Sequence, residues 1–121
     1  MILVDTSIWI DHLRSGDARL AALLNAGQVL THPFVIGEIA MGSLRRRDTV
    51  LSLLTDLPST TVASDLEVLR LIEGHGLHGR GLGYIDAHLV AAALLTSGAS
   101  IWTRDNALDS CARQLGVAAL V

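Results

Sequence analysis

The chain has 121 residues, of which 50% are hydrophobic and 17% charged, and its net charge is −3 at pH 7. This length suits one domain, whose folding buries roughly two thirds of the surface of the unfolded chain. The apolar content excludes an intrinsically disordered protein. The single cysteine, Cys111, excludes a disulfide framework and a zinc site built from several thiolates. We expect one domain spanning residues 1–121.

The sequence also argues against secretion and membrane insertion. The opening residues, MILVDTSIWID, contain an acidic residue and no basic segment, unlike a secretory signal. The two longest stretches without Asp, Glu or Arg, residues 20–37 and 87–103, are broken by polar residues, Gly or Pro. A membrane span needs about 20 continuous apolar residues, so we expect a cytoplasmic protein that does not contact a membrane.

Short apolar runs alternate with segments that carry helix signals. Asp17 is predicted to cap a helix, Pro33 fits a first helical turn, and Ser64 with Glu67 forms a capping box. We expect strands at 2–4, 29–31, 60–63, 100–103 and 117–120, a helix through Ile8, Trp9 and Leu13, helices near 18–26, 34–41, 46–57, 64–74, 84–97 and 107–115, and a loop over 74–83.

This alternation of strands and helices predicts an α/β fold with a short, mostly parallel sheet. Buried apolar strands joined by helical crossovers are typical of a sheet that is covered on both faces. We therefore expect a three-layer α/β/α sandwich. Ligands of such folds bind beyond the carboxyl ends of the strands, so a binding site is expected at that edge of the sheet.

Four carboxylates lie where solvent is not expected to hold them. Asp5 follows the first predicted strand, and Asp105 follows the strand near the C-terminus. Glu38 has only apolar neighbours and Gly37 around it, and Asp86 opens a long apolar helix. An unpaired buried carboxylate costs several kcal/mol or becomes protonated, so the four acids need a common explanation.

A divalent cation provides that explanation, since oxygen-only ligands suit Mg²⁺ or Mn²⁺. The ordinary alternative is that each acid is a helix cap or an ion-pair partner. That alternative fits Asp5, Asp86 and Asp105 better than Glu38, which falls in the middle of a helix.

Four segments in order along the chain resemble one known family. They are VDTSIWID, PFVIGEIAMG, YIDAHLVAAAL and SIWTRDNAL, and they are similar to the PIN domain, specifically to the VapC-type ribonuclease toxins of prokaryotic toxin–antitoxin pairs. The resemblance covers essentially the whole chain.

The resemblance implies a Mg²⁺- or Mn²⁺-dependent endoribonuclease that hydrolyses RNA phosphodiester bonds. It also implies a homodimer and a cognate antitoxin that binds over the site. The implied acidic residues are Asp5, Glu38, Asp86 and Asp105, supported by the hydroxyls of Thr6, Ser7 and Thr103. Family members differ in whether a further acid takes part, which leaves Asp109 open.

On this interpretation, the carboxylates hold one or two cations that polarise the scissile phosphate and acidify water. We expect Asp5 and Asp86 to bind directly. Asp105 and Glu38 bind either directly or by positioning water.

All nine cationic residues are arginine, which is well suited to binding phosphate. The candidates for contacting RNA are Arg45, Arg46 and Arg47, the only basic run, together with Arg80 and Arg104. The alternative is a solvated helix start for the run, a solvated loop residue for Arg80, and an ion pair with a nearby acid for Arg104.

Other function classes fit the sequence less well. The five histidines form no ordered motif for metal-free acid–base catalysis, and Trp9 and Trp102 lie in apolar segments expected to be core. A phosphatase using Asp5 as an aspartyl-phosphate nucleophile would need a second acid in D-x-D spacing, where Ser7 stands instead. A non-catalytic dimeric module that binds an arginine-rich partner through the acids is the remaining alternative.

Overall fold

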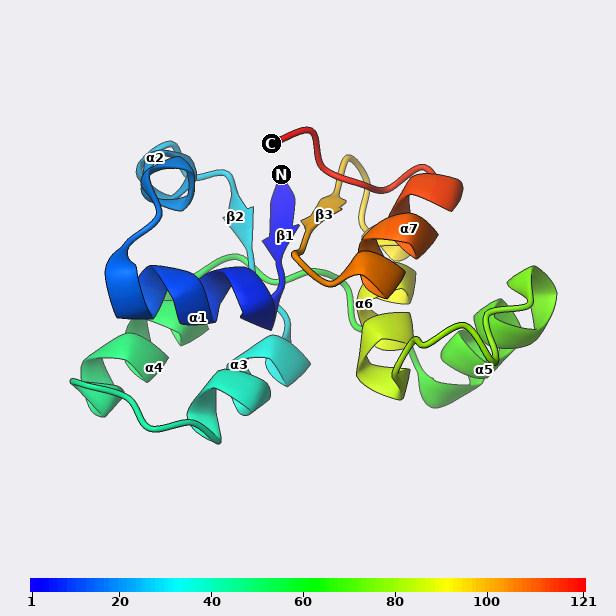
Figure 1. The fold of residues 1–121 in the computed structure, drawn as a ribbon, viewed down its shortest axis with the longest axis horizontal. Coiled ribbons are helices and arrows are strands. Elements are labelled where there is room, and N and C mark those ends of the chain that lie inside the picture. Colours follow the sequence, from blue (N-terminus) through cyan, green and yellow to red (C-terminus); the bar gives the residue numbers. More distant parts are fainter.

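The computed structural model describes all residues from 1 to 121 and contains three strands and seven helices (Figure 1). The strands are β1 (Ile2–Val4), β2 (Val29–Leu30) and β3 (Ser100–Trp102). The helices are α1 (Thr6–Ser15), α2 (Ala18–Asn25), α3 (Pro33–Ala40), α4 (Arg47–Asp56), α5 (Asp65–His75), α6 (Tyr84–Leu95) and α7 (Asn106–Gln114). No helix has the length and apolar character needed to cross a membrane.

The strands form one parallel sheet in the order β2-β1-β3. Leu3 of the central strand is opposite Leu30 on one side and Ile101 on the other. Leu3 and Val4 are completely buried, as expected for a parallel strand covered on both faces. The carboxyl ends of all three strands therefore meet at one edge.

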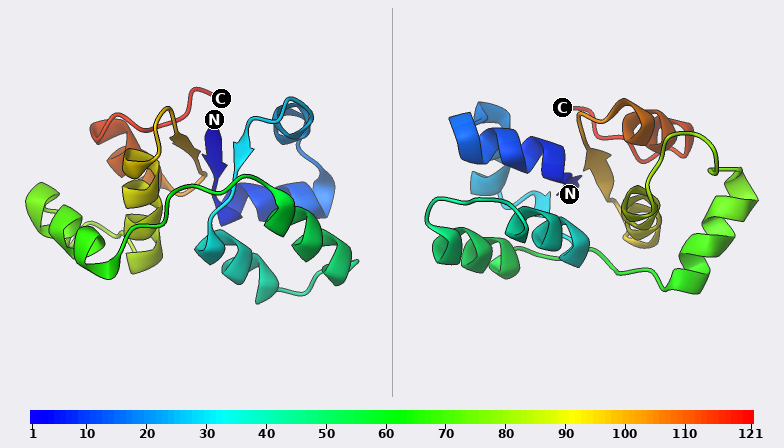
Figure 2. Two further views of the ribbon diagram at one scale, coloured as in Figure 1. Left: turned by 180° about the vertical axis from the view of Figure 1, so that it is seen from behind. Right: turned by 60° about the horizontal axis from the view of Figure 1, so that its bottom comes forward.

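Helices lie on both sides of this short sheet. Figures 1 and 2 show α1 to α4 grouped beside β2, and α5 to α7 grouped beside β3. The main core cluster draws buried side chains from both groups, including Ile8 of α1, Leu89 of α6 and Leu108 of α7. The expected α/β architecture is confirmed.

Local capping signals were reliable guides to where helices begin. Asp17 accepts hydrogen bonds from the backbone N–H groups of Arg19 (2.9 Å) and Leu20 (3.2 Å) at the start of α2. Ser64 and Glu67 form the expected reciprocal capping box at the start of α5. Both predictions are confirmed. Such caps can be predicted from the sequence because they depend only on residues within one turn.

Two predicted strands, 60–63 and 117–120, were wrong. Residues 60–63 contain no strand, and the nearest pairing is an isolated bridge between Thr31 and Ser59. Of residues 117–120, only Ala118 pairs, in an isolated bridge with Ile101. The backbone N–H of Thr61 donates to the Thr96 hydroxyl (2.9 Å) instead of to a neighbouring strand. The same hydroxyl donates to the Ala92 carbonyl, and α6 ends at Leu95, before the predicted Ser97.

Candidate active site

Asp5 lies at the junction of β1 and α1 and is only 7% exposed. One of its carboxylate oxygens, Oδ2, accepts hydrogen bonds from the hydroxyls of Thr103 (2.7 Å) and Ser7 (2.9 Å). Parallel pairing of β1 with β3 brings Thr103 to this position. The Thr103 hydroxyl also accepts the Asp105 N–H (3.0 Å), so one hydroxyl connects two acidic residues.

The other three carboxylates are held in a similar manner, each by one oxygen. Glu38 Oε1 accepts the Thr6 hydroxyl (2.8 Å), which joins α3 to α1. Asp86 Oδ2 accepts the backbone N–H of Gly83 (3.1 Å) at the start of α6. Asp105 Oδ1 accepts the N–H of Leu108 (2.9 Å) as the cap of α7. In all four residues the second carboxylate oxygen has no hydrogen-bond partner in the protein.

The charges of the other three acids act on Asp86. Burial raises the pKa of Asp86, and the nearby charges of Asp5, Asp105 and Glu38 raise it further against the lowering effect of the Gly83 N–H. No arginine neutralises any of the four, since the ion pairs of the chain involve Asp11, Asp17, Asp65 and Asp109 instead. The arrangement is a cluster of negative charge without a protein counter-ion.

Asp109, left open by the sequence, differs from these four. Its Oδ2 accepts the Nε–H of Arg113 (2.8 Å) in an i,i+4 ion pair along α7. That partner gives Asp109 a role on the helix surface that needs no cation.

A group of aromatic rings that the sequence did not single out packs α3 against α6. The Phe34 ring lies 4.7 Å from the His88 ring, centroid to centroid, and the Tyr84 ring lies 4.8 Å from the same His88 ring. The neighbouring His32 is fully buried, and burial together with the charge of His88 lowers its pKa to about 4. The contact links the helices that carry Glu38 and Asp86.

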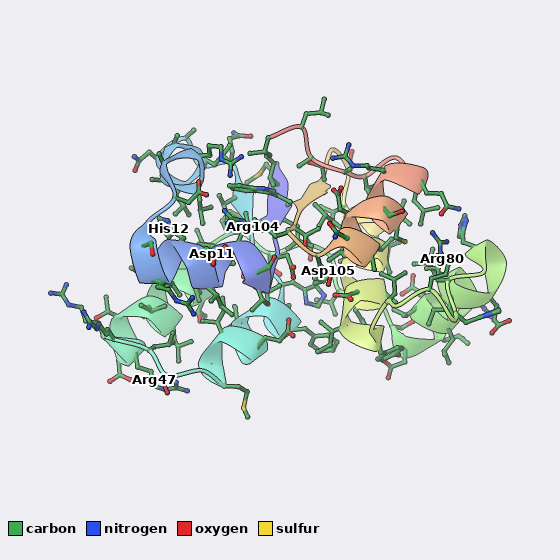
Figure 3. All side chains as sticks on the ribbon, viewed as in Figure 1. Asp11, His12, Arg47, Arg80, Arg104 and Asp105 are labelled. Carbon is green, nitrogen blue, oxygen red and sulfur yellow. The ribbon has the colours of Figure 1, made fainter.

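Most of the arginines proposed to contact RNA are engaged within the chain. Arg47 donates to the carbonyls of Ala40 and Gly42 at the end of α3, and Figure 3 shows it well away from Asp105. Arg80 donates to the Gln114 side chain (2.7 Å), and Arg104 pairs with two acids. Arg45 and Arg46 are exposed and have no ion-pair partner.

The acidic residues do not form a ready-made metal cage. No group of three or more His, Cys, Asp or Glu side chains is arranged so that it could hold a metal ion by itself. The fit to a cation rests on the free oxygen of each carboxylate. Mg²⁺ commonly takes only a few protein ligands and keeps several waters, which suits such an open arrangement.

The fold and this acidic edge define a PIN-domain protein. The family model for the PIN domain matches residues 2–114, and the chain belongs to this family. Two curated relatives, both called Ribonuclease VapC32 and from Mycobacterium tuberculosis strains CDC 1551 / Oshkosh and H37Rv, are 50% identical to it over 118 residues. The match covers 98% of this chain and 95% of each relative.

Proposed function

We propose that this protein is a Mg²⁺- or Mn²⁺-dependent endoribonuclease and acts as the toxin of a toxin–antitoxin pair. Membership of the PIN family and the high identity to two ribonucleases support the reaction class. The substrate is RNA, and the reaction is hydrolysis of internal phosphodiester bonds.

One observation carries the proposal for the site. Each of four carboxylates is oriented by a hydrogen bond to one oxygen and keeps the other oxygen free, and none is paired with an arginine. The repulsion of Asp86 by the other three acids favours a cation, because a cation removes that repulsion and uses the free oxygens. Asp5, Glu38, Asp86 and Asp105 would hold it.

Bound there, a divalent cation would neutralise charge on the scissile phosphate and lower the pKa of water. The protein's contribution is orientation. Ser7 and Thr103 hold Asp5 through Oδ2, so that Oδ1 is presented to the ligand, and Thr6 does the same for Glu38. Fixing the rotamers of the acids in this way reduces the conformational entropy lost when the ligand binds.

We also propose that the chain forms a homodimer, acts in the cytoplasm and is bound by a cognate antitoxin. The exposed Arg45 and Arg46 are the two candidate RNA contacts that are free of intramolecular partners, and we propose that they bind phosphates of the substrate.

The test is cleavage of total bacterial RNA by the purified chain with Mg²⁺ or Mn²⁺, beside an EDTA control. Asp86→Asn removes one charge of the cluster while retaining an acceptor for the Gly83 N–H. Glu73→Gln, at an exposed acid of α5, is the matched control. We expect discrete fragments from the wild type and from Glu73→Gln, and none with EDTA or with Asp86→Asn.

Intact RNA in every lane, together with no Mn²⁺ binding by calorimetry, would overturn the proposal. That outcome would favour a non-catalytic module that uses the same acids to bind an arginine-rich partner. Growth arrest on expression of the wild type, absent with Asp86→Asn, would support the toxin role. Normal growth in both cases would count against it.

A further inference from the structure

We infer that Arg104 is a positioning residue, whose guanidinium, held by Asp11 and Asp17, fixes the segment 103–105 that orients Asp5 and carries Asp105. The inference rests on the proposed function of the acidic edge. It assigns to Arg104 a role different from the RNA contact that the sequence suggested.

The backbone of Arg104 is already part of the site. Its N–H donates to the Ser7 hydroxyl (3.1 Å), the same hydroxyl that donates to Asp5 Oδ2 (2.9 Å). The residues on either side are Thr103, which bonds Asp5, and Asp105, the cap of α7. This connection between β3 and α7 is neither strand nor helix, so side-chain contacts must hold it in place.

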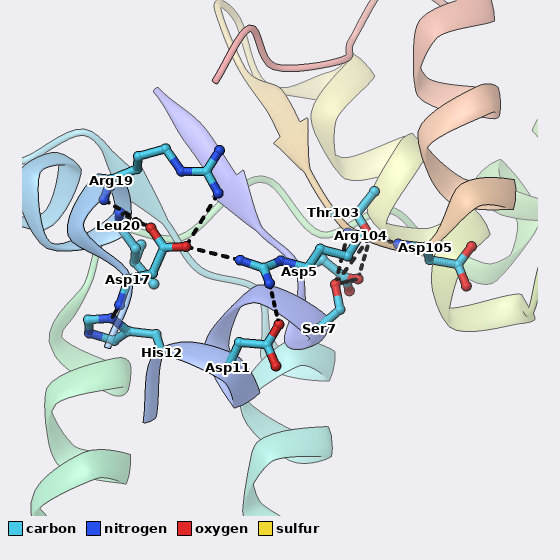
Figure 4. A network of polar contacts seen from close by, with 10 residues as sticks. All are labelled: Asp5, Ser7, Asp11, His12, Asp17, Arg19, Leu20, Thr103, Arg104 and Asp105. Carbon is cyan, nitrogen blue, oxygen red and sulfur yellow. Dashed lines mark hydrogen bonds and ion pairs between the residues drawn. The ribbon is translucent and has the colours of Figure 1, made fainter. Parts of the chain in front are cut away.

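The side chain of Arg104 extends away from the acidic edge toward α1 and α2 (Figure 4). Its Nη1 lies 2.6 Å from Asp11 Oδ2, and its Nη2 lies 3.0 Å from Asp17 Oδ2. The two nitrogens of one planar guanidinium thus contact two carboxylates on different elements. A lysine could not reproduce this fork, because its ammonium is a single point charge.

Asp17, one of the two acids that bind Arg104, is itself held by several contacts. Asp17 is the cap of α2, its own N–H donates to His12 Nδ1 (2.9 Å), and its side chain is only 10% exposed. The backbone N–H of Leu20 and the neighbouring Arg19 lower the pKa of Asp17, so this carboxylate stays charged near neutrality. An isolated surface ion pair stabilises little, but here one guanidinium joins a network of several groups.

The contacts also show why Arg104 is not a free phosphate ligand. To reach RNA, the guanidinium would have to leave both Asp11 and Asp17. Removing a group that orients metal ligands commonly costs ten- to hundredfold in metal affinity or activity. Since Arg104 is partly exposed, we expect the lower end, about tenfold.

The experiment compares Arg104→Ala and Asp11→Asn with the wild type. Mn²⁺ affinity is measured by calorimetry, and kcat and KM are measured on an RNA substrate over a range of salt concentrations. We expect Arg104→Ala to weaken Mn²⁺ binding and to lower kcat, each by about tenfold, with little change in KM or in its salt dependence. Asp11→Asn is expected to shift both quantities in the same direction by a smaller factor.

Matched controls are Arg14→Ala and Glu73→Gln, which make the same charge changes at exposed residues without ion pairs. Both should keep wild-type values. Should Arg104→Ala fail to fold by circular dichroism, Asp11→Asn, which leaves Arg104 in place, decides the question.

An RNA contact predicts the opposite pattern. Arg104→Ala would then raise KM and reduce its salt dependence at unchanged Mn²⁺ affinity, and Asp11→Asn would free the arginine and tighten RNA binding. Either result would overturn the inference. A wild type that neither cleaves RNA nor binds Mn²⁺ would instead refute the proposed function itself.

Discussion

Replacing Thr103 by valine tests the geometry of the candidate site most directly. The variant keeps the shape of the side chain and removes the hydroxyl that donates to Asp5 and accepts from Asp105. A hydrogen bond to a charged group contributes about 1.5–3 kcal/mol, and a neutral one about 1 kcal/mol. Because Thr103 is only 9% exposed, water replaces these bonds poorly.

We expect Thr103→Val to lower the free energy of unfolding by about 2.5–4 kcal/mol and to weaken Mn²⁺ binding by about ten- to hundredfold. Urea unfolding and calorimetry measure the two quantities. Thr103→Ser retains the hydroxyl and should lose only about 1 kcal/mol of stability, with Mn²⁺ affinity close to that of the wild type. If Thr103→Val bound Mn²⁺ as tightly as the wild type, the hydroxyl would not orient Asp5 for a cation and the reasoning would fail.

Three further predictions concern Asp86, His32 and Asp109. Asp86→Asn should raise the free energy of unfolding of the metal-free protein by about 1 kcal/mol, because the raised pKa of Asp86 reflects burial and like-charge repulsion; a less stable variant in urea would contradict this. His32 has a folded pKa of about 4 against 6.5, so the unfolded state takes up the proton first. Stability should fall by about 2 kcal/mol from pH 7 to pH 5, and urea titrations of His32→Asn should show the loss of this component. Asp109→Asn should leave Mn²⁺ affinity unchanged by calorimetry and should lower the free energy of unfolding by about 0.3–0.5 kcal/mol through loss of its Arg113 pair; lost Mn²⁺ binding would instead assign Asp109 to the site.

The parts of the fold that depend on neighbouring residues could be predicted from the sequence. The cap at Asp17 and the capping box at Ser64 each involve one turn of chain. The strands predicted at 60–63 and 117–120 failed because strand pairing depends on partners far along the chain. Thr61 satisfies its N–H with the Thr96 hydroxyl, and nothing in the local pattern around Thr61 indicates that bond.

For the site, too, the residues themselves could be predicted from the sequence, but the contacts between distant residues could not. Glu38, Asp86 and the two acids at strand ends could be singled out because they follow apolar strands or lie among apolar residues, although Asp86 and Asp105 also accept N–H groups at the starts of their helices. Which oxygen is held, and by which hydroxyl, depends on the docking of α1 against α3 and β3, as in the bond from Thr6 to Glu38. Asp11 and Asp17, which bind Arg104, come from separate elements, as do the Phe34 and His88 rings that join α3 to α6. No spacing in the sequence predicts these contacts.

The pairing of the first strand with the last has a consequence for synthesis on the ribosome. β1 is made first, yet Leu3 meets Ile101 and Asp5 receives the Thr103 hydroxyl only after nearly the whole chain has been translated. Contacts between such distant residues form late, because closing the intervening loop costs conformational entropy. A stalled or truncated product ending before β3 contains three of the four acids without the assembled edge. Under the proposed assignment, the four acids can therefore come together only when translation is nearly complete, because of the order of the strands.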